Sequence, residues 1–418
     1  MTLLTLSPPA PAAGAYAPGF APIAERFAAQ LRAGDEIGAG LAVYQRGQCV
    51  VDLWGGHADR ERGAAWTRDT RVVVFSVTKG LVAMALHQLV DRGQLDWDAP
   101  VARYWPDFAA AGKDAITVRT LVNHRAGLVG LDQPITIDDC TDPARRPWLV
   151  ELLERQRPAW PPDAQQGYHA ITWGLYVREL AERALAAAAP ATAPSLGAFL
   201  RAELFAPLAA DADLGTPPEV DPRVATLYPP GTAGRVARMV AQAVRPASTE
   251  GRILRGALGR GSPTRAAFLN PRTGPAGLAV YDSLAVRRAE LAWAGATASA
   301  QGVARAYLPF AGDGEAEGRR FLRAGALDAV RGRQSWSERD LVLHKPIGWS
   351  QGFLKDEPHL FSPQPAAFGH AGMGGALGWC DPVAGLTVGY VMNRLDWRVR
   401  SPRAIALCHA LYRCEAVV

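Results

Sequence analysis

Residues 72–79 read Val72-Val73-Val74-Phe75-Ser76-Val77-Thr78-Lys79. The first four form a short apolar run that is typical of a buried strand. From Val77 to Arg92 apolar residues recur at helical spacing, and Gly93 follows as a stop signal. The pattern therefore predicts a buried helix with Ser76 at its N-terminus.

Ser76 and Lys79 are candidates for a nucleophile and its base. A serine hydroxyl is a weak nucleophile at neutral pH and needs a base within hydrogen-bond reach. Positions i and i+3 lie on one face of a helix, so the Lys79 amine can approach the Ser76 oxygen. Burial would lower the lysine pKa, and the helix N-terminus would place partial positive charge where an oxyanion forms. The alternative is an N-cap serine followed by a surface lysine.

Lysine is rare in this chain. Only four lysines stand against forty-one arginines, the lysines being Lys79, Lys113, Lys345 and Lys355. Random placement would give about 0.1 Ser-x-x-Lys matches in such a chain. Arginine cannot lose its proton in a protein whereas a buried lysine can, so lysine at position 79 favours a base.

The composition excludes several classes of protein. The chain has 418 residues and a formal net charge of +5, with acids mixed among the bases, which argues against nucleic-acid binding. No stretch of about eighteen apolar residues predicts a membrane span, and Met1–Ala15 lacks the basic start of a signal peptide. The odd number of cysteines and the lack of a CxxC pair predict reduced thiols in a cytoplasmic protein: Cys49, Cys140, Cys380, Cys408 and Cys414.

Strand patterns lie near both ends of the chain. The early ones form a predicted hairpin, Gly38–Tyr44 and Cys49–Trp54, joined by a short polar turn. The late ones are the apolar runs Trp349–Leu354, Gly375–Cys380 and Leu386–Asn393. Helices are predicted at Ile23–Ala33, Leu175–Ala189 and Pro402–Cys414.

This order predicts an α/β protein of the α+β type. Residues 21–95 and 330–418 would form one α/β domain from both ends of the chain. Residues 96–329 would form a mainly helical domain with irregular loops that line a cleft, and residues 1–20 would be a loose start. A cleft where the two domains meet is the expected place for a site.

Together these features resemble the penicillin-recognising serine hydrolases, which include class C β-lactamases, DD-peptidases and family VIII carboxylesterases. Ser76-Val77-Thr78-Lys79 matches their S-x-x-K motif, and further segments match in order. Thr117–Leu128 resembles the family segment T-[IV]-x-x-L-L-x-H-x-S-G-L, except that Val122 replaces the second Leu and Ala126 replaces the Ser. Gly167–Ala170 resembles the segment that carries the family's tyrosine. Gly369–Gly375 resembles the strand that follows the active site, and Leu386–Asn393 resembles the family's last strand. The resemblance covers residues 20–415 approximately. It implies a β-lactamase/transpeptidase-like fold, with an antiparallel sheet from both chain termini flanked by helices.

The resemblance implies a role for each matching residue. Ser76 would be the acylated nucleophile and Lys79 the base that prepares it. Tyr168 would be a phenol, with its pKa depressed by the lysine, that relays protons to the leaving group and from the deacylating water. The alternative is a core tyrosine with a bonded hydroxyl. The backbone N–H groups of Ser76 and Met373 would form the oxyanion hole.

Three further residues are expected to contact substrate. His370 takes the place of the lysine in the lactamase K-T-G triplet, and Gly372 would let the ligand approach the strand. His169 would line the cleft, whereas His124 has a structural role in the family. The resemblance and the lack of metal-ligand spacing predict neither a metal nor a cofactor.

The departures from the lactamase pattern favour an uncharged substrate. The Y-x-N triplet is replaced by Tyr168-His169-Ala170, so the asparagine amide is missing. His370 is mostly neutral at pH 7 and offers no permanent cation to a carboxylate. Similar substitutions occur in the esterase branch, so the predicted function is hydrolysis of carboxylic esters through an acyl-Ser76 intermediate.

Other functions stay open at this point. The same scaffold could be an acyltransferase, a β-lactamase or a DD-peptidase, or a catalytically silent scaffold. The lack of a G-x-S-x-G elbow argues against the α/β-hydrolase fold. The sequence predicts a small-molecule ester as the partner, without nucleic acid or membrane insertion.

Overall fold

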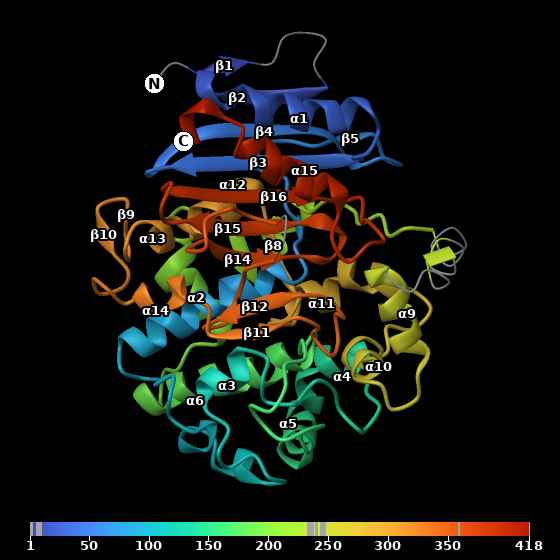
Figure 1. The fold of residues 1–418 in the computed structure, drawn as a ribbon, viewed down its shortest axis with the longest axis vertical. Helices are drawn as coiled ribbons and strands as arrows, with labels where there is room; N and C mark the ends of the chain where they lie inside the picture. The colour runs from blue at the N-terminus through green and yellow to red at the C-terminus, as the bar shows by residue number, and fades with distance from the viewer. Residues whose placement is uncertain are drawn as a thin grey trace.

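The structure is a computed structural model that describes residues 3–5, 11–231, 238, 241–242, 248–357 and 360–417. Its main feature is one large antiparallel sheet with helices on both faces, beside a helical region that lies below the sheet in Figure 1. This mixed α and β architecture, with a large antiparallel sheet flanked by helices, is the one that the resemblance implied. No helix within the described ranges is long and apolar enough to cross a membrane.

Both ends of the chain build the sheet. Its strand order is β1-β2-β4-β3-β16-β15-β14-β13-β12-β11. The central contact pairs β3 with β16, from Gln45 opposite Leu386 to Ala39 opposite Met392. The bounds are β1 Leu4–Thr5, β2 Ala12–Tyr16, β3 Gly38–Gln45, β4 Gln48–Asp59, β11 Ser335–Ser337, β12 Ile347–Ser350, β13 Phe353–Lys355, β14 Phe368–Ala371, β15 Leu377–Asp381 and β16 Leu386–Met392.

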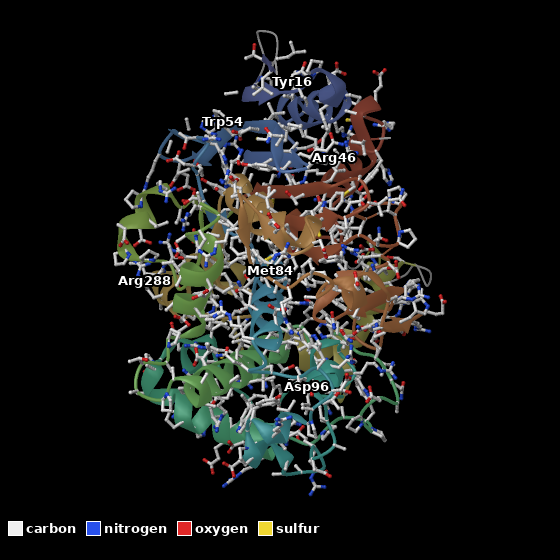
Figure 2. The ribbon with its side chains drawn as sticks, turned by 90° about the vertical axis from the view of Figure 1, so that its left-hand side faces the viewer. Tyr16, Arg46, Trp54, Met84, Asp96 and Arg288 are labelled. Carbon is white, nitrogen blue, oxygen red and sulfur yellow. The ribbon has the colours of Figure 1, made fainter. Side chains whose placement is uncertain are left out.

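Helices cover the two faces of the sheet. On one face, α1 (Ala21–Arg32) contacts α15 (Pro402–Leu411), and on the other α12 (Ala300–Ala306) and α2 (Val77–Asp91) contact the strands (Figure 1). Every residue of α2 from Val77 to Leu89 is buried, as the all-round apolar pattern predicts. Figure 2 shows Met84 of α2 in the middle of the molecule, between the sheet near Trp54 and the helices near Asp96.

The middle of the chain is mainly helical. Its helices are α3 Val118–Val122, α4 Ile137–Thr141, α5 Arg146–Arg155, α6 Thr172–Ala188, α7 Leu196–Leu200, α9 Thr249–Leu258, α10 Pro263–Phe268 and α11 Leu284–Arg288. A small sheet, β7 (Ala212–Leu214), β8 (Ala296–Ala298) and β6 (Val72–Val73), joins this region to the strand before Ser76. The division of the chain into domains at 95 and 330 stays a prediction.

Part of the N-terminal segment that we expected to be loose is a strand. Ala12–Tyr16 pairs with β4 from Gly55 to Val51, because the outer edge of β4 presents unpaired backbone N–H and C=O groups. Residues 1–2 and 6–10 of the segment lie outside the described residues.

The apolar run Trp349–Leu354 is not one strand. It spans the end of β12, a two-residue turn at Gln351-Gly352, and the start of β13. Both turn residues have positive φ, 46° at Gln351 and 88° at Gly352, which is the geometry of a tight hairpin turn. The dipeptide Gln351-Gly352 was the only turn signal inside this apolar run, and the prediction of a single strand missed it.

The Asn393 side chain connects the C-terminal part of the sheet to its N-terminal part through hydrogen bonds. Loss of this side chain is expected to destabilise the fold. Its fully buried amide accepts from the Gly38 N–H at 3.0 Å and donates to the carbonyls of His57 and Ala58 at 2.9 and 3.1 Å. Asn393→Ala removes all three of these hydrogen bonds, although the Ala58 carbonyl still accepts from the Thr226 N–H at 3.0 Å. We therefore expect the free energy of unfolding in urea to fall by about 2 kcal/mol. The exposed Gln48→Ala should change it by less than about 0.5 kcal/mol. Equal effects of the two substitutions would show that Asn393 is no anchor.

Candidate active site

Ser76 lies at the N-cap position of α2, directly after the small sheet that contains β6. Phe75 has a φ of 46°, an uncommon value for a residue with a side chain. Its buried ring lies 5.3 Å from the ring of Tyr281, a contact that helps to hold this backbone turn. The turn places the half-buried Ser76 at the N-terminus of α2, as the sequence predicted.

Lys79 is fully buried and points at Ser76. Its Nζ lies 3.3 Å from Ser76 Oγ, 2.7 Å from the carbonyl oxygen of Ala170 and 3.0 Å from that of Trp293. Burial lowers the pKa of the Lys79 ammonium well below its usual value. A neutral amine has two N–H donors and one lone pair. With the two carbonyls accepting both donors, the lone pair is left for the Ser76 hydroxyl proton.

The Ala170 contact replaces the one that the missing asparagine would make. Alanine has no amide side chain, so we expected the asparagine contact to Lys79 to be missing at position 170. The structure supplies a backbone carbonyl instead, and Trp293 supplies a second one. Main-chain carbonyls exist at every position, so the sequence holds no signal for either acceptor.

Tyr168 reaches the same oxygen from the other side. Its Oη lies 3.1 Å from Ser76 Oγ, and its ring stacks on Trp349 at a centroid distance of 5.4 Å and an angle of 5°. Burial raises the pKa of Tyr168 to about 12, so the expected depression of this pKa by the lysine was wrong. A neutral Lys79 amine carries no charge that could lower the phenol pKa.

His169 does not line a cleft, contrary to our expectation. It is fully buried, and its Nε2 accepts from the Leu128 N–H at 2.9 Å. Its proton must therefore lie on Nδ1, which faces His124 Nδ1 at 3.4 Å. Burial lowers the pKa of His169 to about 3 and that of His124 well below its usual value. Both rings are thus neutral packing groups behind Tyr168.

His370 lies beside the reaction centre but is buried. Its ring centroid is 6.3 Å from that of Tyr168 and 5.7 Å from that of Trp349. Its Nδ1 lies 2.9 Å from the Ala371 carbonyl, so Nδ1 carries the proton and Nε2 is left as an acceptor. Burial lowers the pKa of His370 well below its usual value, which keeps the ring neutral. A contact between His370 and substrate stays a prediction.

Gly372 brings the end of β14 against the nucleophile turn. A Cβ at this position would lie 2.5 Å from the Val74 carbonyl, so the glycine permits a close approach of backbone to backbone. The space thus serves the protein chain, whereas we expected it to serve a ligand. Met373 follows and is 37% exposed. Within the described residues, no hydrogen bond engages the N–H of Ser76 or of Met373, so both donors are available to an oxyanion.

Asp340 supports Tyr168 and has no motif that would reveal it. This buried carboxylate accepts from the Tyr168 N–H at 3.1 Å and from the N–H groups of Val342 and Leu343 at 2.9 and 2.8 Å. It therefore fixes the backbone of the tyrosine to the loop between β11 and β12. In the part of the chain that the structure describes, no group of three His, Cys, Asp or Glu side chains is placed to hold a metal ion.

The sequence model of the Beta-lactamase family matches residues 23–410 of this chain. The chain belongs to the Beta-lactamase family. It is therefore a serine hydrolase of this family.

Several relatives within the family carry names that concern esters or penicillin. The chain is 35% identical over 389 residues to "Esterase/beta-lactamase LipL" of Mycobacterium tuberculosis. This alignment covers 91% of this chain and 83% of that protein. The structure of a family VIII carboxylesterase superposes with a TM-score of 0.82 at 32% identity, over 96% of this chain and 99% of that one. The structure of a penicillin-binding protein homologue from Caulobacter crescentus superposes with a TM-score of 0.80 at 31% identity, over 96% of this chain and 99% of that one.

Proposed function

We propose that this protein hydrolyses carboxylic esters through an acyl-Ser76 intermediate. The observation that carries the proposal is the placement of Ser76 Oγ between the Lys79 amine at 3.3 Å and the Tyr168 hydroxyl at 3.1 Å. The similarity to a family VIII carboxylesterase and to an esterase/beta-lactamase supports ester cleavage. Ala170 and the neutral His370 replace the polar groups that would bind an acylamino or carboxylate substituent.

In the acylation step, Ser76 attacks the ester carbonyl. Lys79 accepts the hydroxyl proton as Oγ bonds to the carbonyl carbon, and the N–H groups of Ser76 and Met373 stabilise the oxyanion. When the C–O bond breaks, Tyr168 gives its proton to the leaving alkoxide. The Lys79 ammonium then returns a proton to the phenolate, so both groups end neutral.

The deacylation step uses the same groups in reverse. A water molecule gives a proton to the Tyr168 oxygen while the phenol proton moves to Lys79, and the resulting hydroxide attacks the acyl carbon. As the tetrahedral intermediate collapses, the bond between Ser76 Oγ and the acyl carbon breaks, the Lys79 ammonium gives its proton to Ser76 Oγ, and the carboxylic acid is released. The raised pKa of Tyr168, about 12, keeps the phenol protonated and able to act as an acid throughout the neutral range.

Removal of the nucleophile tests the proposal. Ser76→Ala is expected to lower kcat/KM for a short-chain 4-nitrophenyl ester by about ten-thousandfold, since no acyl-enzyme can form. Wild type should also be labelled at Ser76 by a fluorophosphonate, and the variant should not. Ser262→Ala, at the start of α10, serves as the control and should retain full rate and labelling. Full activity in Ser76→Ala would exclude the acyl-Ser76 mechanism, and an unlabelled wild type would favour a silent scaffold.

A second candidate is β-lactam hydrolysis, which the names of two relatives favour, an esterase/beta-lactamase and a penicillin-binding protein homologue. Turnover of nitrocefin by wild type and not by Ser76→Ala would support it. Acyl transfer stays open too, and adding an alcohol acceptor and measuring the transfer product tests it. A cytoplasmic location remains part of the proposal and rests on the five cysteines, all of them free thiols.

A further inference from the structure

Residues 372–376 form the turn between β14 and β15, and we refer to them as the oxyanion turn. The proposed mechanism uses the Met373 N–H of this turn to stabilise the oxyanion. Two glycines follow, with a φ of 84° at Gly374 and 128° at Gly375, values that residues with a side chain rarely adopt. Because glycine has little conformational preference and no side chain to pack, the direction of the Met373 N–H depends on the groups that hold the turn from outside.

The Gly374 carbonyl is a point at which the turn is held. It accepts from the Asp396 N–H at 3.0 Å and from Arg403 Nη2 at 3.2 Å. A Cβ at position 374 would lie 2.5 Å from Leu395 Cδ2, so the turn also packs closely against the segment that follows β16. A main-chain donor and a side-chain donor thus meet at one oxygen, one residue after the candidate oxyanion donor.

Arg403 is the second residue of α15, and only 8% of it is exposed. A guanidinium group has five N–H donors, and the structure gives each of them an acceptor. The acceptors are the carbonyls of Gly374, Arg394 and Asp35 at 3.2, 2.7 and 2.8 Å, Ser401 Oγ at 3.3 Å and the Glu36 carboxylate. Five bonds in different directions fix the orientation of this planar group, and the single nitrogen of a lysine could not make them.

Glu36 anchors the Arg403 guanidinium. Its carboxylate has no exposed surface, and it accepts from Arg403 Nη1 and from the Tyr390 hydroxyl. Glu36 lies between α1 and β3, Tyr390 belongs to β16, and α15 lies against α1 (Figure 1), so both ends of the chain build this anchor. Burial raises the pKa of Glu36 to about 7, and the charge of Arg403 opposes this rise. At pH 8 the carboxylate is therefore mostly ionised and pairs with the guanidinium.

We propose that Arg403, anchored by Glu36, is a positioning residue that fixes the direction of the Met373 N–H through its bond to the Gly374 carbonyl. This inference rests on the proposed function, in which that N–H faces the oxyanion. Within the described ranges, neither side chain forms a hydrogen bond to the proposed catalytic residues. Negative charge on the oxygen develops mainly in the transition state, so a displaced donor should lower kcat and leave KM almost unchanged.

Arg403→Lys tests the positioning role. Lysine keeps a positive charge opposite Glu36 and lacks the second nitrogen that reaches Gly374. At pH 8 we expect kcat for 4-nitrophenyl butyrate to fall about tenfold, which is less than the loss of a whole oxyanion donor, and KM to stay within about twofold. Circular dichroism and the melting temperature show whether the variant is folded.

Arg305→Lys is the matched control. Arg305 lies in α12 and likewise pairs with a glutamate, Glu317 at 2.8 Å, and donates to a main-chain carbonyl, that of Leu208. Neither of these partners belongs to the oxyanion turn. This variant should keep kcat within about twofold, even if its melting temperature falls.

Phenylboronic acid reports on the oxyanion donors without turnover. When it binds, Ser76 Oγ bonds to boron, the serine proton passes to Lys79, and one boron hydroxyl lies where the oxyanion would form. Calorimetry at pH 8 should show about tenfold weaker binding to Arg403→Lys than to wild type or Arg305→Lys. A role in stability alone would lower the melting temperature and leave this affinity unchanged.

Wild-type kcat and boronic acid affinity in a folded Arg403→Lys would overturn the proposal, and so would equal losses in Arg403→Lys and Arg305→Lys. If Arg403→Lys does not fold, Glu36→Gln provides the test, because glutamine keeps the size of the side chain and removes the charge opposite Arg403. It should lower kcat and boronic acid affinity about threefold, and no change in either quantity would overturn the proposal.

A wild type that does not hydrolyse the butyrate ester would instead contradict the proposed ester hydrolysis. The boronic acid titration needs only the nucleophile and the oxyanion donors, so it would still decide whether Arg403 positions the turn.

Discussion

Lys79→Arg is expected to lower kcat/KM for a short-chain nitrophenyl ester by about a thousandfold or more. Arginine keeps its proton in any protein environment, so it offers no lone pair to the Ser76 hydroxyl. It could still donate to the carbonyls of Ala170 and Trp293, which makes this substitution a test of the proton acceptor itself. Steady-state kinetics with active-site titration measure the effect.

Lys113→Arg provides the matched control. Lys113 is also fully buried, but its Nζ donates to three carbonyls, those of Ala110, Glu154 and Gln156, at 2.8, 2.6 and 2.8 Å. Three acceptors use all three protons of an ammonium and leave no lone pair. This substitution should change the stability and leave kcat within about twofold. An equal loss of activity in both variants would mean that Lys79 serves the fold and not the chemistry.

The lowered pKa of Lys79 also sets the pH dependence. The amine acts as a base only when neutral, and burial places its pKa well below the usual value for lysine. We therefore expect the enzyme to keep its activity at neutral pH and to lose it only as the pH falls through the lowered pKa of Lys79. A rate that rises steeply up to pH 10, near the usual lysine pKa, would contradict a neutral Lys79.

Tyr168→Phe is expected to lower kcat by about a hundredfold to a thousandfold with little change in KM. The variant keeps the ring that stacks on Trp349 and loses only the hydroxyl that lies 3.1 Å from Ser76 Oγ. Without it, the leaving alkoxide has no acid beside it and the water has no relay to Lys79. Steady-state kinetics, combined with the rate of fluorophosphonate labelling, separate this loss from a loss of fold.

Tyr176→Phe is the control for the tyrosine. Tyr176 is fully buried, and its hydroxyl donates to the Leu153 carbonyl at 3.1 Å, away from Ser76. Its loss should cost stability of about 1 kcal/mol and leave kcat unchanged. If Tyr168→Phe retained wild-type kcat, the proton path would have to run through Lys79 alone.

The sequence predicted those parts of the site that depend on local spacing or on an ordered motif. Ser76 and Lys79 are one helical turn apart, so their contact follows from the i, i+3 geometry of α2. Tyr168 was found by resemblance, because no local rule brings residue 168 to residue 76. The strand patterns predicted β3 and β16 to within one residue at each end, since each is an apolar run between turns. β4 continues to Asp59, five residues beyond its predicted end, because its second half is not apolar.

What the sequence missed depends on the backbone or on burial. The carbonyls of Ala170 and Trp293 bind the lysine through atoms that every residue has. Asp340 looks like any loop aspartate in the sequence, because the three backbone N–H groups that it accepts from are brought to it only by the fold. The predicted direction of the Tyr168 pKa shift was wrong for the same reason. Burial raises this pKa, and an uncharged Lys79 amine does not lower it.

The pairing of β3 with β16 has a consequence for protein synthesis. The ribosome makes residues 38–45 long before residues 386–392, with a delay on the order of tens of seconds at typical rates of translation. Until the last strands leave the exit tunnel, the sheet against which α2 packs does not exist. A nascent or prematurely terminated chain should therefore carry a serine with no reactivity, and only the finished polypeptide becomes an enzyme.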